Sequence, residues 1–595
     1  MEEIAGPIPA LYQNLKYRYG FFASIGKAPI INPYWGRYQV SDFYFTYDKT
    51  LEFSIREGVD SWIIVYGKII STRMHSILHG EVTNHLFELL NRDKSHFLDE
   101  LDYCCGRFVI VYLKDGEINI INDATGMKSI YYSKKCVSVA ASHYSILSDY
   151  LDLASSTAVH DYITYTDGRS FGITCLPGFI TTKEGLYCLC PNTELSLQDG
   201  KVKRYFPRAD LVRTSASEAI EKATSLMQAL ITKLSENYPL AISITAGLDS
   251  RVTTAAARNI AHRVFFFTNN RTGLPSHTID CEVANKILQD ADLPHFILPL
   301  EEVNNGQRYG SDDFNRFKDI MSHNVDIEAQ FQGAYEYYQQ IPHGFLHIRS
   351  NIAEICRARY HAPPFESIGQ KPASAESFAA IHNLWTNRKW TNFSVEMFQQ
   401  YIDETGLLEH CFNYDPYALY YWEHLMGRWH ASALQESDVA FDTVSLYNCR
   451  AILQSFLAAP FEDQVSKRLM YGAIEKMWPD LLAYPINPKK ETPASSQPFV
   501  QPSLEIKSQG SKYVFTVDVE ESDLLFAFYV YKDGSIIEKK WYTAENQFSI
   551  EFIPPGFYKV RFFIVKNKDY EKGNLTDEQK VTGWFDPVLI TATSK

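Results

Sequence analysis

The sequence predicts an α/β protein with β-rich ends. Three observations support this prediction. Short apolar runs separated by turn residues fill positions 1 to about 205. Strand-like and helix-like runs then alternate between 214 and 300, and residues 503–595 return to short strand-like runs. The chain should therefore combine a layered N-terminal α+β part, a doubly wound central part and a C-terminal β-sandwich.

The N-terminal part is expected to contain layered sheets with a few helices. Residues 61–71 (SWIIVYGKIIS) and 106–124 (GRFVIVYLKDGEINIINDA) run apolar or alternate, with turn residues between the runs. A helix is expected over 79–93, and three further strands over 176–207. This region should end near Pro207.

The central part begins with a helix. Residues 214–236 place apolar side chains at helical spacing, with Ser215 or Ser217 as the N-cap. Strands are expected at 239–245, 263–268 and 295–300, with helices after 250 and over 280–291. That order is typical of a parallel doubly wound sheet, and residues 312 to about 480 should be mostly helical.

A proline-rich segment separates the last part from the rest. Residues 485–502 hold five prolines together with Ser and Thr, as in a linker or irregular loop. We therefore expect domains over 1–207, with 1–50 as an extra segment, and over 208–490. A linker over 491–502 and a β-sandwich over 503–595 should follow.

Composition excludes several classes of protein. The net charge of −14 argues against broad binding to nucleic acid, and no apolar run approaches the roughly 18 residues of a membrane span. The N-terminus carries acids where a signal peptide is basic, so a cytoplasmic protein without membrane insertion is expected. The ten cysteines are scattered without paired CxxC motifs, which disfavours structural zinc.

The sharpest motif is ITAGLDSR at 244–251, between a buried strand and a helix. Backbone N–H groups at such a turn attract phosphate oxygens, and Gly247 lets the backbone approach them closely. Thr245 and Ser250 add hydroxyl donors. Asp249 would repel phosphates unless Mg²⁺ lies between them. The motif therefore predicts a site for a magnesium–nucleotide complex.

This loop resembles the pyrophosphate-binding SGG-x-DS loop of the asparagine synthetase family, with Thr245 for Ser and Ala246 for the first Gly. That family includes β-lactam synthetases, lasso-peptide cyclases and amide synthases of polysaccharide clusters. Residues 346–360 (LHIRSNIAEICRARY) resemble its second loop, SG-x-G-x-DE. There Ser350 and Ile352 replace two loop glycines. The resemblance spans about residues 50–490.

The resemblance implies particular site residues. Asp249 and Glu354 would hold Mg²⁺, and Arg357 either faces the nucleotide or pairs with Glu354. Lys489, Lys490 and Arg428 fall near catalytic cations of the family. Asn351 replaces the Tyr that helps to deprotonate the amide in β-lactam formation, which disfavours that reaction. The residues expected to bind ATP are Ile244, Thr245, Ala246, Gly247, Leu248, Asp249, Ser250, Thr268, Arg349 and Ser350.

Residues 106–133 are similar to a stretch of the family's glutamine amidohydrolase domain. The resemblance implies an Ntn-type amidohydrolase-like fold at the N-terminus and a PP-loop adenine-nucleotide α-hydrolase-like fold with a helical extension in the centre. The active glutaminase uses an N-terminal Cys, whereas this sequence starts Met1-Glu2-Glu3 and its first cysteine is Cys104. Glutaminase activity is therefore expected to be absent.

The expected function is that of an ATP-dependent ligase that needs Mg²⁺. A carboxylate would form an acyl-adenylate with release of pyrophosphate, and ammonia or an amine would then take the acyl group. The carboxylate belongs to a small molecule or a sugar, and the β-sandwich favours a uronate or polysaccharide precursor. Lasso-type or other peptide or small-molecule amide or lactam formation is an alternative, as is an inactive scaffold of the same fold. A homodimer is left open.

Overall fold

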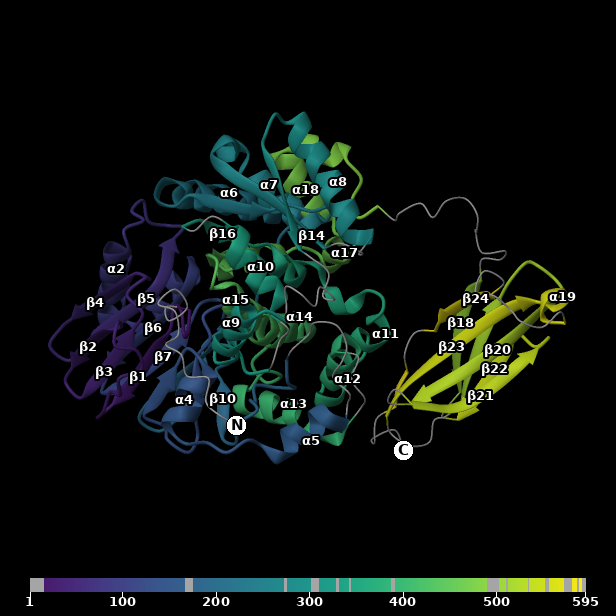
Figure 1. The fold of residues 1–595 in the computed structure, drawn as a ribbon, viewed down its shortest axis with the longest axis horizontal. Helices are drawn as coiled ribbons and strands as arrows, with labels where there is room; N and C mark the ends of the chain where they lie inside the picture. Colours follow the sequence, from purple (N-terminus) through teal and green to yellow (C-terminus); the bar gives the residue numbers. More distant parts are fainter. Residues whose placement is uncertain are drawn as a thin grey trace. The chain divides into compact units, whose positions relative to one another are not determined.

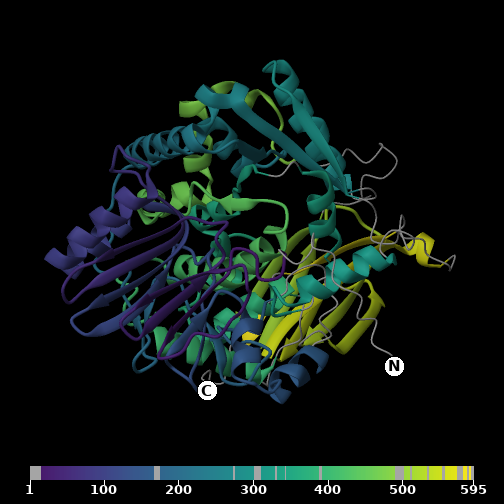
Figure 2. The same ribbon diagram turned by 60° about the vertical axis from the view of Figure 1, so that its left-hand side comes forward.

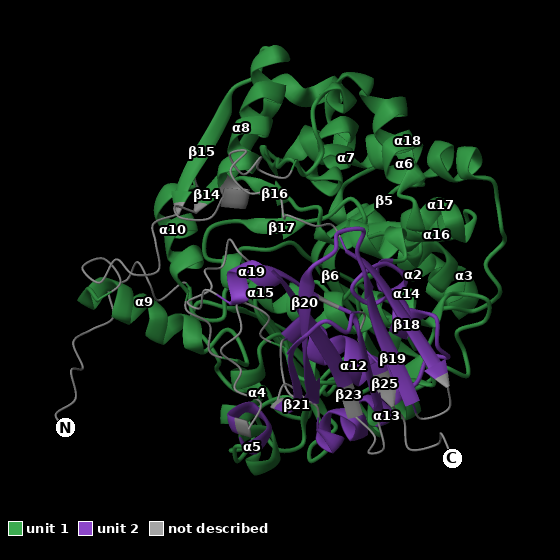
Figure 3. Cartoon of the chain, turned by 90° about the vertical axis from the view of Figure 1, so that its right-hand side faces the viewer, with its two compact units in different colours: residues 1–160, 174–358, 400–488 green, residues 161–173, 359–399, 489–595 purple. Residues whose placement is uncertain are grey.

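The computed structural model describes residues 15–165, 175–271, 275–300, 310–327, 331–341, 344–386, 391–488, 502–509, 512–532, 535–551, 556–571, 580–585 and 588–590. It is a mixed α/β structure with several sheets (Figure 1). The chain divides into two compact units, coloured separately in Figure 3. One comprises residues 1–160, 174–358 and 400–488, and the other comprises 161–173, 359–399 and 489–595.

Two antiparallel sheets form the N-terminal layers of the first unit. The first has the order β10-β8-β9-β1-β3-β2 and the second has the order β12-β11-β7-β6-β5-β4. Figure 2 shows their purple and blue strands side by side. The strands of the first sheet are β1 (Phe21–Ile25), β2 (Gly36–Val40), β3 (Phe43–Tyr47), β8 (Tyr131–Ser133), β9 (Val139–Ala141) and β10 (Leu186–Cys188). Those of the second are β4 (Phe53–Glu57), β5 (Trp62–Ser71), β6 (Cys104–Lys114), β7 (Glu117–Asn122), β11 (Thr193–Ser196) and β12 (Val202–Arg204).

The two sheets share one apolar core, to which Phe45 of β3 and Tyr66 of β5 both contribute. Helix α2 (His79–Arg92) packs on β4 and β5, and α4 (Tyr144–Tyr150) packs on β8, β9 and β10. Helix α3 (Lys94–Leu101) packs against α2. The layers therefore follow the order helix, sheet, sheet, helix, which agrees with the layered α+β arrangement expected from the sequence.

The third sheet is parallel and has the order β15-β14-β13-β16-β17. Helix α6 (Ala216–Asn237) precedes it, and a capping box between Ser215 and Glu218 fixes its first turn. The strands are β13 (Leu240–Ser243), β14 (Val264–Arg271), β15 (His295–Leu300), β16 (Leu346–Ile348) and β17 (Asp442–Val444). Helices α7 (Leu248–Ala256) and α8 (Pro275–Asp290) make the first crossovers, and η1 (Arg258–Arg263) follows α7.

The chain between β15 and residue 488 is mainly helical, as expected. Short 3-10 or π segments interrupt it, including η2 directly after β16. The elements of the first unit are α9 (Asp312–Ser322), α10 (Gln332–Gln340), η2 (Asn351–Arg357), α14 (Pro416–Tyr420), η4 (Tyr421–His430), α15 (Ala431–Ser437), α16 (Arg450–Leu457), α17 (Phe461–Val465), α18 (Arg468–Met477) and η5 (Pro479–Ala483). Among the described residues, no helix is long and apolar enough to span a membrane.

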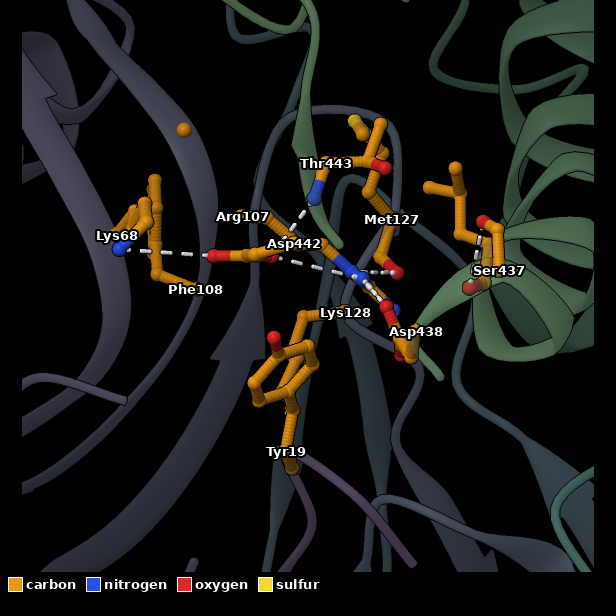
Figure 4. A network of polar contacts seen from close by, with 12 residues as sticks. Tyr19, Lys68, Arg107, Phe108, Met127, Lys128, Ser437, Asp438, Asp442 and Thr443 are labelled. Carbon is orange, nitrogen blue, oxygen red and sulfur yellow. Dashed lines mark hydrogen bonds and ion pairs between the residues drawn. The ribbon is translucent and has the colours of Figure 1, made fainter. Parts of the chain in front are cut away.

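A buried charged network joins the N-terminal layers to the parallel sheet (Figure 4). Arg107 of β6 donates to Asp438 through its two terminal guanidinium nitrogens, with Nη2 at 2.8 Å from Oδ2. Arg107 also donates from Nε to the Met127 carbonyl at 3.0 Å. Asp442, which begins β17, lies 3.6 Å from Nζ of Lys68 on β5. These four charges span two sheets and fix β17 against β5 and β6.

The second unit contains a two-sheet sandwich. One sheet has the order β18-β19-β22, and the other has the order β21-β20-β23-β24 with β25 also paired to β23. The strands are β18 (Ser503–Gln509), β19 (Lys512–Asp518), β20 (Leu524–Lys532), β21 (Ser535–Thr543), β22 (Gln547–Glu551), β23 (Gly556–Lys566), β24 (Lys580–Trp584) and β25 (Val588–Ile590). The unit's helical elements are η3 (Arg359–His361), α11 (Glu366–Gly369), α12 (Ala375–Thr386) and α19 (Asn567–Tyr570), while α5 (Thr157–Tyr165) and α13 (Asn392–Thr405) cross its boundary.

Candidate functional site

Two loops meet at the carboxyl ends of neighbouring parallel strands. The first, residues 244–250, follows β13, and the second, residues 349–357, follows β16. The strand order reverses between β13 and β16, because β14 and β15 lie on one side of β13 while β16 and β17 lie on the other. Ligands of open α/β sheets bind at this kind of switch point. The fold therefore places both loops of the predicted nucleotide site at one edge.

The first loop is folded on itself by side-chain hydrogen bonds. Ser250 Oγ accepts from the Thr245 backbone N–H at 3.0 Å and lies 2.9 Å from the Thr245 hydroxyl. The Gly247 N–H donates to Thr245 Oγ1 at 3.1 Å. The Ala246 N–H donates to a carboxylate oxygen of Asp280, on α8, at 2.9 Å. Three consecutive loop amides thus have partners within the protein.

The loop ends at the start of helix α7. Gly247 is the N-cap and supplies no capping side chain, so the first-turn N–H groups of α7 carry no side-chain cap. The φ of Gly247 is −78°, which other residues also adopt. The space around Gly247 restricts substitution more than its backbone conformation does, because a Cβ added there would lie 3.2 Å from Thr245 Oγ1. The arrangement leaves an uncapped helix N-terminus facing the switch point, which favours an anion.

A buried arginine holds the end of the described first unit against this loop. Arg251 is fully buried in α7 and donates to the carbonyls of Leu481, Tyr484 and Pro485, at 3.1 Å and 2.8 Å for the first two. The Asn487 N–H donates to the Ala246 carbonyl at 3.0 Å. The segment 481–487 is therefore a third wall of the loop, although it is more than 230 residues away in the sequence.

The second loop packs on α7 through its polar side chains. Ser350 is buried, and its hydroxyl donates to Thr253 Oγ1 on α7 at 2.9 Å. Arg349 donates from Nε to Asn351 Oδ1 at 2.8 Å, and its backbone N–H donates to the Val444 carbonyl at 2.9 Å. The Ser350 hydroxyl is thus used within the protein, while Arg349 and Asn351 orient each other.

The two predicted metal ligands lie around one guanidinium group. Arg357 Nη2 is 3.1 Å from Asp249 Oδ2 and also donates to Glu354 Oε1. The Tyr421 hydroxyl donates to the other Glu354 oxygen at 3.1 Å. Arg357 therefore bridges the two acids in this structure, pairing with Asp249 as well as with Glu354.

Asp249 is the electrostatically unusual member of this group. Its Oδ1 is buried and has no hydrogen-bond partner among the described residues. Burial raises the pKa of Asp249 to about 6, while Arg357 lowers it and Glu354 raises it. A buried carboxylate oxygen without a donor is costly, and a cation at that oxygen would remove the cost. The loop thus carries more negative charge than its own residues neutralise.

The donor set fits a magnesium ion shared with a ligand. Among the described residues, no group of three or more His, Cys, Asp or Glu side chains could enclose a metal by itself. Mg²⁺ prefers oxygen donors and is usually held by one or two carboxylates together with substrate phosphates and water. Asp249 and Glu354 offer that number of carboxylates, next to an uncapped helix N-terminus.

Other residues singled out in the sequence lie elsewhere. The Ile244 N–H donates to the Phe267 carbonyl, and its own carbonyl accepts from the buried Thr268 hydroxyl at 2.6 Å. These groups therefore brace β13 against β14. Arg428 is buried, donates to the Ile180 carbonyl at 2.6 Å and lies 3.6 Å from Asp326. The structure does not bring Arg428 to the two loops, because its partners belong to the core under the first N-terminal sheet. Lys489 and Lys490 lie outside the described residues.

Asp280 and Arg251 are functional candidates that the sequence did not single out. Asp280 reaches the loop from α8, 34 positions along the chain, and Arg251 ends the motif but points to 481–485. Tyr421 reaches Glu354 from a third segment. The arginine at the end of the motif is the one signal that the sequence offers. The other two contacts depend on tertiary packing that spacing does not encode.

Comparison with known proteins gives partial likenesses. No protein-family model matches the chain, and no curated protein matches it. One similar solved structure is a glutamine phosphoribosylpyrophosphate amidotransferase from B. subtilis complexed with ADP and GMP, 10% identical over 48% of this chain with a TM-score of 0.21. Another is an allosteric regulatory enzyme of purine biosynthesis, 12% identical over 43% of this chain with a TM-score of 0.20. The match spans 61% of each solved chain. Similarities this weak establish neither an activity nor a ligand for this chain.

Proposed function

We propose that the chain is an ATP-dependent, amide-forming ligase of asparagine-synthetase type. It would activate a carboxylate as an acyl-adenylate, release pyrophosphate, and transfer the acyl group to ammonia or an amine. The observation that supports this most strongly is the meeting of Asp249 and Glu354 at the switch point between β13 and β16. The two acids come from different loops, 105 residues apart, and share a single arginine.

The residues of the two loops would have distinct roles. The uncapped start of α7 would bind the β- and γ-phosphates through backbone N–H groups. Arg357 would move from the acids toward phosphate oxygens, because a guanidinium binds phosphate as well as carboxylate. Asp249 and Glu354 would hold Mg²⁺, which when bound neutralises the charge that develops on the leaving pyrophosphate. Lys489 and Lys490, which follow the wall 481–487, would stabilise the reacting acyl group.

The nitrogen donor would be ammonia or an amine and not glutamine. Eight of the ten cysteines are buried. Burial raises the pKa of Cys281 to about 11 and that of Cys449 to about 12, and it raises the pKa of Cys104 and Cys105 as well. A thiol needs a lowered pKa to act as a nucleophile near neutral pH. Incubation of the full chain with glutamine, with or without ATP, should therefore release no glutamate, and steady glutamate release would contradict this assignment.

The decisive experiment removes the charge of each acid without changing its shape. Asp249→Asn and Glu354→Gln should each lower Mg²⁺-dependent pyrophosphate release by about a hundredfold or more, or about 3 kcal/mol in the barrier. The matched control is Asp115→Asn in the turn between β6 and β7, where the side chain is 86% exposed, and it should change the rate by less than about twofold. Melting temperatures of all variants are measured in parallel.

The outcomes separate clearly. Near-normal pyrophosphate release from both loop variants would show that the loop pair is not the active site. Loss of release without a fall in melting temperature would support the assignment. The assay uses ATP–pyrophosphate exchange with a panel of carboxylates, in which sugar uronates, peptides with a free carboxyl group and small amino acids represent the substrate classes. Exchange that depends on one class names the substrate.

A catalytically inactive scaffold is the second candidate, and one observation favours it. The amides of Thr245, Ala246 and Gly247 already donate to Ser250, Asp280 and Thr245. A scaffold has no use for Mg²⁺-dependent nucleotide affinity. Titration of the full chain with a fluorescent ATP analogue, with and without Mg²⁺, distinguishes the two: saturable binding that requires Mg²⁺ supports the ligase, and its absence supports the scaffold.

A further inference from the structure

The outer face of the sheet β21-β20-β23-β24 carries aromatic rings that the sandwich core does not use. Every second residue of β20 and β23 packs in the core and faces the other sheet, as Phe526, Phe528 and Phe562 do. The positions between them point outward, because successive strand residues alternate between faces. Tyr529 and Phe563 are outward residues on adjacent strands, with ring centroids 4.9 Å apart.

A bulge in the edge strand adds further rings to this face. Phe526 pairs with Thr543 and Phe528 with Lys540, so β21 has one residue more than β20 between these pairs. Such a bulge turns two neighbouring side chains toward one side, and here they are Trp541 and Tyr542. Trp541 lies 5.8 Å from Tyr529 and is 62% exposed. The ring centroid of Tyr542 lies 5.1 Å from that of Tyr570.

Cations lie directly on these rings. Lys539 Nζ is 4.9 Å from the Tyr529 centroid and 5.9 Å from that of Trp541. The Arg561 guanidinium is 4.9 Å from the Phe563 centroid. Register pairs Tyr529 with Arg561 and Tyr531 with Lys559, so these outward positions of β20 and β23 carry cations and no acid. The face therefore combines ring surfaces with positive charge.

We propose that this face binds an acidic polysaccharide, with Trp541 and Tyr529 stacking on sugar rings and Lys539 and Arg561 binding carboxylates. Aromatic rings offer flat apolar surfaces to the C–H faces of sugars, and cations bind carboxylates through charge-assisted hydrogen bonds. The proposal does not depend on the ligase function, because this site lies in a separate compact unit from the two loops.

Charge density favours a polysaccharide over nucleic acid. A nucleic acid carries a phosphate at every nucleotide, and its affinity grows with the number of Lys and Arg side chains that neutralise them. Residues 503–595 contain 12 Lys and Arg against 14 Asp and Glu, so the sandwich as a whole is not basic. A few cations placed among rings match a polymer with one carboxylate on each sugar better than they match a dense polyanion.

The test uses the full chain and polygalacturonate as the probe, with neutral dextran and poly(dT) as comparators. We expect retardation of the chain by polygalacturonate in affinity electrophoresis. Trp541→Ala should weaken this binding by about tenfold or more, the scale measured when a stacking aromatic is lost. Lys539→Ala should weaken it several-fold and reduce its dependence on salt.

Matched controls are Tyr34→Ala, an exposed tyrosine of the first unit, and Lys507→Ala, an exposed lysine on the other sheet of the sandwich. Both should bind within about twofold of the unmodified chain, and melts of all four variants should coincide. Absence of binding to polygalacturonate, equal binding to neutral dextran, or tighter binding to poly(dT) would overturn the proposal. So would binding that Trp541→Ala and Lys539→Ala leave unchanged.

Discussion

Two buried charged clusters in the first unit differ in how completely their charges are paired. Around Arg107, the guanidinium binds Asp438 through two nitrogens, and Lys68 pairs with Asp442 and, at 2.9 Å, with Glu52. Around Arg357, one guanidinium serves both Asp249 and Glu354. With Lys128, whose ammonium attracts Asp438 and Asp442, the first cluster has three cations for three acids, whereas the second has one arginine for two acids.

This difference separates a structural cluster from a ligand site. A buried charge is tolerated when a partner neutralises it, and an excess charge is costly unless something from outside completes it. Asp249 carries this cost because it shares one guanidinium with Glu354 while burial raises its pKa to about 6. We therefore expect the two clusters to respond oppositely to removal of a charge: the Arg107 cluster should lose stability, and the Asp249 cluster should lose activity.

The largest expected effect on stability is that of Arg107→Ala. Removal of the guanidinium leaves the buried Asp438 without its main partner and takes one of two ion-paired cations from Asp442, so the free energy of unfolding should fall by about 3–5 kcal/mol. Urea denaturation of the full chain, monitored by tryptophan fluorescence, measures the change. The matched control is Arg468→Ala, whose side chain is 71% exposed, and which should shift the unfolding free energy by less than about 0.5 kcal/mol. Equal effects of the two variants would show that the Arg107 cluster does not fix the layers together.

The sequence predicted local elements better than it predicted contacts between segments that are far apart in the chain. The helix after Ser215 and the alternation of β13, α7 and β14 follow from capping and periodicity, which neighbouring residues determine. The loop motif also located Asp249. By contrast, β16 and β17 could not be ordered in the sheet from the sequence, because register between distant strands depends on tertiary packing.

The same distinction applies to single arginines. Arg428 was expected near the reaction, yet it binds Ile180 and Asp326, two residues that spacing does not relate to it. The role of Arg251, the last residue of the ITAGLDSR stretch, does not follow from the motif, because its carbonyl partners are 230 or more positions away. Long side chains reach partners that no local pattern identifies.

A smaller effect of opposite sign is expected for Asp249→Asn in the absence of nucleotide. The pKa of Asp249 is raised to about 6, so the folded chain holds a proton that the unfolded chain releases near pH 4. Its contribution to stability is therefore present at low pH and is lost as pH rises through 6. At pH 8 the Asn variant should unfold with about 1–3 kcal/mol more free energy than the unmodified chain, and the gain should shrink as pH falls toward 5.

Denaturation at pH 5 and pH 8 measures this gain. A variant that loses pyrophosphate release but gains stability at pH 8 has lost a functional charge and not a structural one. A loss of stability at both pH values would instead place Asp249 with the structural cluster, and the contrast between the two clusters would fail.

The smallest expected effect concerns Asp280. Its carboxylate accepts the Ala246 N–H at 2.9 Å, on the loop that the proposed function assigns to pyrophosphate. A phosphate oxygen and this carboxylate would compete for the same donor and repel each other, so Asp280→Ala should tighten binding of an ATP analogue by about threefold to tenfold, or about 1 kcal/mol. Asp280→Asn keeps an acceptor without the charge and should have a smaller effect. Isothermal titration at fixed Mg²⁺ measures both. If both variants instead weaken binding, Asp280 acts with Asp249 and Glu354 in holding the cation. The cluster around Arg357 then contains three acids instead of two.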